Sequence, residues 1–152
     1  MFLTYNDLAN LFPKVIGIKD PHLLFHTVTT NSNMQQYRGV FIPIGEESGE
    51  LKTAIENGAV AVLWQEGKEI PRYTPNHFPI FLTNDLLKGL KDMMELYIEK
   101  ISKNHLVKKD GTNFLFSNDI ILKENDATYD IALKLEKIRE IKQLQDGKEG
   151  AK

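Results

Sequence analysis

The segment from residue 30 to residue 64 constrains the fold more than any other part of the chain. An apolar run from Val40 to Ile44 is followed by a polar stretch, and a second apolar run from Ala59 to Trp64 comes after Gly58. Between the runs, Ser48 is placed to cap a short helix that Gly58 ends, because glycine adopts the left-handed backbone without strain. Strand, helix and strand in this order form a βαβ-type unit. The sequence therefore predicts an α/β fold.

The flanking segments add strands and helices to this unit. Leu23 to Thr30 is rich in β-branched and aromatic residues, as strands are. After Asn84 and Asp85, either of which can cap a helix, apolar residues recur every three or four positions up to Ile101. The other predicted elements are a helix at 4–12 capped by Thr4, a polar tip at 31–36, a surface loop at 67–78 and a strand at 79–83. We expect a single α/β domain at 1–104, with a mixed sheet flanked by helices.

A different pattern begins after residue 104. The Asp110-Gly111 dipeptide suits a tight hairpin turn, and short apolar runs at 106–108, 113–116 and 120–122 predict a small antiparallel β-meander. A helix capped by Asp126 and running to about Gln145, with a frayed tail, is expected to follow. Residues 105–152 are thus predicted to form a hairpin and amphipathic helix extension. Its apolar stripe can fold back on the sheet, which we favour, or dock on a second copy or another protein.

Composition excludes several classes of protein. The 152 residues include 19 basic and 21 acidic side chains, a balance without the basic excess that non-specific nucleic-acid binding requires. There is no cysteine, and no apolar run approaches the ~20 residues needed to cross a bilayer. We expect a cytoplasmic protein that binds neither nucleic acid nor membrane. No metal site is expected, because His22 and His26, on a strand, would lie about 13 Å apart.

Three motifs resemble the N-terminal domain of the Mur ligases, which add amino acids or a dipeptide to UDP-N-acetylmuramoyl peptides. That family has a T-D-S-R segment, then P-G-D-L-F-V-A-L-x-G, then A-I-x-x-G-A-x-A-V-V. The corresponding segments here are Thr30-Asn31-Ser32-Asn33, Arg38-Gly39-Val40-Phe41-Ile42-Pro43-Ile44-Gly45 and Ala54-Ile55-Glu56-Asn57-Gly58-Ala59-Val60-Ala61-Val62. The last is a close match and the first two are partial. The resemblance spans residues 26–101 and implies a Mur ligase N-terminal domain-like fold in bacterial cell-wall (peptidoglycan) biosynthesis.

Departures from the family pattern bear on activity. Asn31 replaces the family's aspartate, Asn33 replaces its arginine, and Ser48 to Leu51 stands where the family has D-G-H-x-F. The G-T-N-G-K-T phosphate loop that opens the family's ATP-binding domain does not follow the long helix. Ser32 and Ser48 also lack the glycine-elbow context of a nucleophile. We therefore expect no ligase activity, no catalytic residue and no cofactor in this stand-alone domain.

The family's N-terminal domain holds the UDP end of its substrate, and the resemblance implies Thr30, Ser32, Gly45 and Glu46 as substrate-binding residues. Hydroxyls and backbone amides at strand ends are suited to uracil and phosphate oxygens. Glutamates 46, 47 and 50 cluster at the same rim, however, and carboxylates repel a diphosphate.

Three hypotheses follow for the function. The first is a non-catalytic binding or interaction module that recognises a UDP-sugar or peptidoglycan precursor, or a cell-wall enzyme; a scaffold that kept the fold and lost the ligand is its less specific form. The second is a subunit of a split ligase, completed by a separate ATP-binding chain. The third is a structural module that self-associates, or binds a protein partner, through the C-terminal helix.

Overall fold

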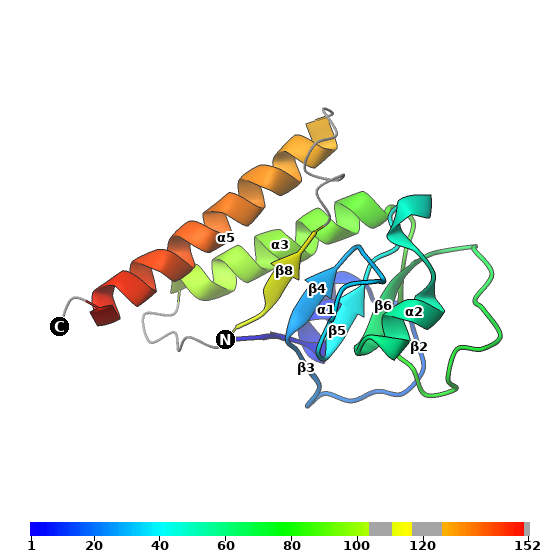
Figure 1. Ribbon diagram of the computed structural model, residues 1–152. Helices are drawn as coiled ribbons and strands as arrows, with labels where there is room; N and C mark the ends of the chain where they lie inside the picture. The colour runs from blue at the N-terminus through cyan, green and yellow to red at the C-terminus, as the bar shows by residue number, and fades with distance from the viewer. Residues whose placement is uncertain (104–110, 117–125, 151–152) are drawn as a thin grey trace.

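The computed structural model, which describes residues 1–103, 111–116 and 126–150, is an α/β fold built on a mixed sheet (Figure 1). The strands are β1 (Leu3–Thr4), β2 (Val15–Ile16), β3 (Leu24–Phe25), β4 (Thr27–Thr29), β5 (Gly39–Phe41), β6 (Ala59–Gln65), β7 (Ile80–Thr83) and β8 (Asn113–Leu115). The helices are α1 (Tyr5–Leu11), the 3-10 helix η1 (Glu46–Ser48), α2 (Leu51–Glu56), α3 (Leu86–Lys103) and α5 (Asp126–Gly150). The predicted fold class is confirmed at this level.

Six strands form the main sheet in the order β2-β7-β6-β5-β4-β8. Neighbouring strands from β7 to β8 pair in parallel, and β2 pairs antiparallel with β7 at one edge. The antiparallel strands β1 and β3 form a separate two-stranded ribbon. Parallel strands are buried on both faces, which explains why β4 to β6 consist of almost uninterrupted apolar or β-branched residues.

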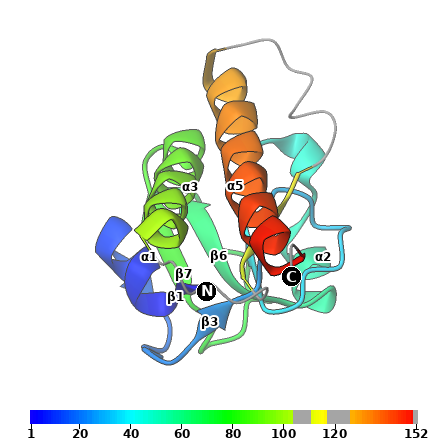
Figure 2. The same cartoon turned by 90° about the vertical axis from the view of Figure 1, so that its left-hand side faces the viewer.

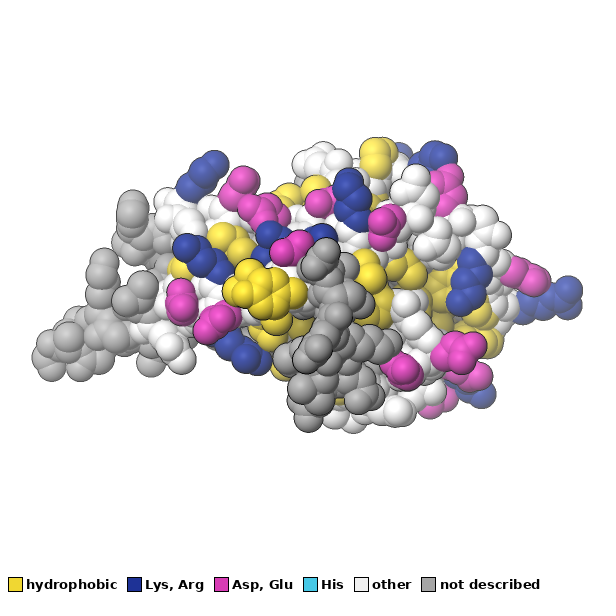
Figure 3. Space-filling model, turned by 90° about the horizontal axis from the view of Figure 1, so that it is seen from above, with side chains coloured by type: hydrophobic (Ala, Val, Ile, Leu, Met, Phe, Trp, Pro, Cys, Tyr) yellow, Lys and Arg dark blue, Asp and Glu magenta, His cyan; other side chains and the backbone are white. Residues whose placement is uncertain are grey.

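Helices cover both faces of the sheet. Figure 2 shows α3 and α5 side by side in front of the sheet, with α1 beside α3 and α2 behind. The larger core cluster joins α1, α3 and α5 to the face that carries Val28, Val40 and Leu63. A smaller cluster packs Leu51 and other α2 residues on the opposite face. On the surface seen in Figure 3, basic and acidic side chains of the described residues are interspersed and form no continuous basic area.

The link between β4 and β5 differs from the predicted polar tip. A tip joins adjacent strand ends, but β4 and β5 are parallel, so residues 30–38 must return along the whole length of the strands. Gln36 makes this possible, because its buried side-chain amide donates to the carbonyls of Asn31 (3.4 Å), Ser32 (3.5 Å) and Met34 (3.1 Å). Asn57 also donates to the Ser32 carbonyl at 2.8 Å. These amide groups replace the hydrogen bonds that a helical crossover would supply.

At α1 and α2, two of the predicted helix boundaries are right and one is wrong. Thr4 and Asp7 form a capping box at the start of α1, and Gly58 has a left-handed φ of +115° after α2. Ser48 does not cap α2: it lies in η1, and Glu50 occupies the N-cap position without a side-chain cap. The two-residue shift arises because η1 takes up the chain between Gly45 and Gly49.

The C-terminal part of the chain joins the same core. β8 pairs in parallel with β4, Val28 opposite Phe114, so the predicted antiparallel meander is wrong for this segment. The expected partner segments 106–108 and 120–122 lie outside the described residues. α5 continues to Gly150, beyond the predicted end at Gln145, and buries Ile131, Leu135 and Ile138 against the domain, as we favoured. No helix in the described ranges is long and apolar enough to span a bilayer.

Candidate functional site

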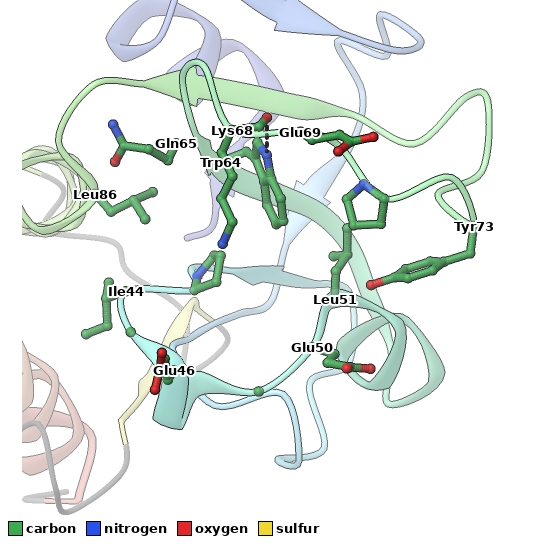
Figure 4. A pocket seen from close by; sticks show the side chains of 14 residues that line it. Ile44, Glu46, Glu50, Leu51, Trp64, Gln65, Lys68, Glu69, Tyr73 and Leu86 are labelled. Carbon is green, nitrogen blue, oxygen red and sulfur yellow. Dashed lines mark hydrogen bonds between the residues drawn. The ribbon is translucent and has the colours of Figure 1, made fainter.

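A pocket of about 590 Å³ lies where the parallel strands β5, β6 and β7 end (Figure 4). Ligands of open α/β sheets bind in crevices at the carboxyl ends of strands, and small-molecule pockets typically measure about 300–1,000 Å³. The lining residues are Pro43, Ile44, Gly45, Glu46, Gly49, Glu50, Leu51, Trp64, Gln65, Lys68, Glu69, Pro71, Tyr73 and Leu86. Position and volume both fit a small-molecule site.

The segment after β5 forms one wall with its backbone. Gly45 has an extended φ of −164°, and a Cβ built on it would have no atom within 4 Å. The chain then turns into η1, where the Gly45 carbonyl accepts a hydrogen bond from the Ser48 amide at 3.0 Å. Gly45 lines the pocket, and a side chain at this position would start in open space.

Trp64 supplies the aromatic wall at the end of β6. Its side chain is only 5% exposed, and its indole Nε1 donates to the Lys68 carbonyl at 3.1 Å. The Lys68 ammonium lies 5.0 Å from the centre of the indole, a cation–π contact that holds the cation over the ring. Figure 4 shows the Lys68 side chain beside Trp64 and reaching into the pocket. The sequence predicts Trp64 as the end of an apolar run, which agrees with its buried ring but does not place it in a pocket.

The loop between β6 and β7 forms a further wall of the pocket. Tyr73, 47% exposed, accepts a hydrogen bond from the Lys52 amide at 3.1 Å in the first turn of α2. That amide has no acceptor within the helix, because the first helical amides are unpaired. The loop is thereby attached to α2. Its pocket residues, Lys68, Glu69, Pro71 and Tyr73, fall in a stretch that sequence reasoning treated only as surface loop.

The pocket carries more negative than positive side chains. Among the residues that the structure describes, Glu46, Glu50 and Glu69 line it together with one cation, Lys68. Within the described residues, none of these four forms an ion pair. An anionic ligand would therefore bind through Lys68 and keep its distance from the carboxylates.

The structure separates the four predicted site residues. Gly45 and Glu46 line the pocket, whereas Thr30 and Ser32 do not and are each 1% exposed. The Ser32 amide donates to the Ser48 carbonyl at 2.8 Å. A Cβ placed on Gly49 would lie 2.0 Å from the Ser32 hydroxyl oxygen. The backbone that follows η1 thus covers Ser32. The Thr30 hydroxyl is buried without a hydrogen-bond partner among the described residues.

No candidate metal centre was found in residues 1–103, 111–116 and 126–150, because no three His, Asp or Glu side chains in these ranges come close enough together. His26, considered above as half of a metal pair, stacks instead on the ring of Phe2 with centroids 4.2 Å apart.

A scan against models of known protein families finds no match to this chain, and a search of curated proteins finds no significant match. The likeness to the Mur ligase N-terminal domain thus stays a prediction from the sequence motifs.

Proposed function

We propose that this chain is a non-catalytic binding module of the Mur ligase N-terminal type, and that its pocket holds a UDP-linked peptidoglycan precursor. The observation that carries the proposal is the pocket at the ends of β5, β6 and β7, which includes Gly45 and Glu46, two of the four residues implied by the family resemblance. The pocket's volume of about 590 Å³ suits a nucleotide or nucleotide-sugar fragment.

The lining chemistry supports the same class of ligand. Tyr73, which is half exposed, offers a ring face for a uracil or sugar ring, and the Lys68 ammonium over the buried Trp64 ring is the cation for a phosphate oxygen. Glu46, Glu50 and Glu69 are suited to accept hydrogen bonds from sugar hydroxyls. In this arrangement Lys68 attracts the diphosphate, while the three carboxylates of the same lining repel it.

Thermal unfolding with and without UDP, UDP-N-acetylglucosamine and a UDP-muramoyl peptide tests the proposal. A ligand present at ten times its Kd adds about 1.4 kcal/mol to the stability of the folded state. For a chain of this size we expect the Tm to rise by about 3 to 6 °C. Absence of any shift with all three compounds at millimolar concentration would reject UDP-linked ligands.

Gly45→Leu is the sharpest variant, because the added side chain enters open space from an extended backbone. We expect the unliganded Tm to stay close to that of the wild type while the ligand-induced shift disappears. Lys68→Ala should weaken UDP more than uridine, because uridine has no phosphate. The exposed Lys19→Ala is its control.

The other two hypotheses have different signatures. A split ligase would require a separate ATP-binding chain, and co-purification with a phosphate-loop protein would favour it. Self-association through α5 has less support, because its residues Ile131, Leu135 and Ile138 are buried within the same chain.

A further inference from the structure

The ribbon of β1 and β3 has one buried and one outward face. Leu3 and Phe25 are paired and completely buried. Side chains alternate along a strand, so Leu24 lies on the outward face, where it is 37% exposed. Phe2 and His26, the next residues along, stack on each other. In Figure 1 β3 lies at the lower edge of the molecule, away from α5.

Tyr37 and Arg38 extend this outward face. The Tyr37 ring meets the His26 ring edge-on, with centroids 5.1 Å apart and an interplanar angle of 76°. The Arg38 guanidinium carbon lies 5.8 Å from the centre of the Tyr37 ring. Phe2, His26, Tyr37 and Arg38 thus form a continuous row of side-chain contacts, which we call the Tyr37–Arg38 ridge.

The backbone beneath the ridge is firmly held. The Thr27 hydroxyl donates to the Tyr37 carbonyl at 3.1 Å, and the His26 amide donates to the Arg38 carbonyl at 3.1 Å. Arg38 has a φ of +46°, and it is the one non-glycine residue with positive φ in the described ranges. A side chain in this left-handed region strains the backbone, and such strain is concentrated at functional positions. The backbone that carries Tyr37 and Arg38 is therefore fixed by the fold.

Exposure and residue types point to a protein interface. Tyr37 is 67% exposed, one of the highest values among the large hydrophobic side chains described. Tyrosine and arginine are enriched among the residues that dominate binding energy in protein interfaces. Tyrosine has only two side-chain torsions, so it loses little conformational entropy on binding.

The charge of the ridge restricts the partner further. Within the described residues the Arg38 side chain forms no ion pair, and its guanidinium lies near the Tyr37 ring. The planar guanidinium of arginine can bind a carboxylate through two parallel N–H···O hydrogen bonds. The complementary ligand is an acidic side chain next to an apolar one that packs on Tyr37.

We propose that the Tyr37–Arg38 ridge docks a protein partner through a short segment in which a glutamate or aspartate is flanked by apolar residues. The ridge lies at the amino ends of β4 and β5, and the pocket lies at the carboxyl end of β5. The two surfaces lie at opposite ends of the strands, so this inference does not depend on the proposed function.

Two peptide libraries provide the test. One has the form acetyl-Gly-X-Glu-X-Gly-amide, where X is Leu, Phe or Tyr, and the other has glutamine in place of glutamate. Binding to the full chain is measured by calorimetry, or by NMR of the Arg38 side chain. We expect the best glutamate peptide to bind, its glutamine counterpart to bind at least tenfold more weakly, and Arg38→Gln or Tyr37→Ala to cause a similar loss.

Matched controls lie on α5: Tyr129, 66% exposed, and Arg139, also exposed. Tyr129→Ala and Arg139→Gln should bind as the wild type does. Arg38→Gly removes the strained side chain, so it should fold with an equal or higher Tm and yet lose the peptide.

Several results would overturn the proposal. The first is that no glutamate peptide binds. The second is that Arg38→Gln binds the glutamate peptide as tightly as the wild type does, and the third is that the glutamine peptides bind as tightly as the glutamate peptides. Two others would reassign the ridge to a different occupant. One is binding of a single-stranded oligothymidine that requires Arg38, and the other is concentration-dependent dimerisation that requires Tyr37.

Discussion

The hydroxyl of Tyr97 connects the backbone of Thr112 to the first residue of the chain. It accepts a hydrogen bond from the Thr112 amide at 3.0 Å and donates one to the Met1 carbonyl at 3.0 Å. The Thr112 hydroxyl continues the connection, accepting from the Leu3 amide at 2.8 Å and donating to the Phe25 carbonyl at 2.6 Å. A buried polar network therefore joins β8 to the N-terminal ribbon.

Tyr97→Phe should destabilise the fold, because it leaves the buried Thr112 amide without its acceptor. Such a loss costs about 1 to 3 kcal/mol. Urea unfolding at neutral pH measures it. Tyr129→Phe, at an exposed position, should change the unfolding free energy by less than about 0.5 kcal/mol. An equal, small effect of both variants would contradict a stabilising role for the network.

Stability should also depend on alkaline pH through Tyr97. Burial raises the pKa of Tyr97 to about 12, with the Thr112 amide acting in the opposite direction. In the unfolded chain a tyrosine ionises near pH 10, so between about pH 10 and pH 12 the unfolded state loses its proton first. The stabilisation is complete below about pH 10 and falls as the pH rises towards 12.

The measurement is the unfolding free energy at about pH 9 and about pH 11. The wild type should lose stability between these values, and Tyr97→Phe should lose less. Some pH dependence should remain in the variant, because burial also raises the pKa of Tyr5. A wild type with no loss at the higher pH would contradict the prediction.

Gly49→Ala should disrupt the segment that covers Ser32. The added Cβ would lie 2.0 Å from the Ser32 hydroxyl oxygen, and the φ of +86° disfavours any side chain. Strain and overpacking together predict a loss of about 2 kcal/mol or more. Gly45→Ala is the matched control, with its Cβ in open space, and should stay within about 0.5 kcal/mol of the wild type. The measurement is the denaturant midpoint of each variant. Equal midpoints for Gly49→Ala and Gly45→Ala would show that the segment at Gly49 does not pack closely over Ser32.

Leu135→Ala on α5 should cost about 2 to 5 kcal/mol, because it opens a cavity in the shared core. Leu133→Ala, two residues away and 46% exposed, should cost less than about 1 kcal/mol. Thermal unfolding compares the two. A larger effect of Leu133→Ala, particularly one that depends on protein concentration, would instead favour docking of the outer face of α5 on a second copy.

Local patterns in the sequence predicted most elements correctly. The capping box of Thr4, the apolar run at Ala59 to Trp64 and the helical spacing up to Ile101 each act within a few residues, so each could be read without the fold. The parallel direction of β4 and β5 could not be read in this way. It depends on Gln36 and Asn57 satisfying the carbonyls of residues 31–34, contacts that no periodicity reveals.

The candidate site divides in the same way. Gly45 and Glu46 were predicted from the family motifs and line the pocket, whereas Trp64, Lys68 and Tyr73 come together there only because β5 and β6 are neighbours and the following loop bonds to α2. Because capping and periodicity are local, the sequence predicted the start of α1, the end of α2 and the strand β6, but it misplaced the start of α2 and the end of α5. The tertiary structure alone decided that β8 joins β4, that Ser32 is covered and that the pocket is open, because these depend on packing between residues distant in the chain.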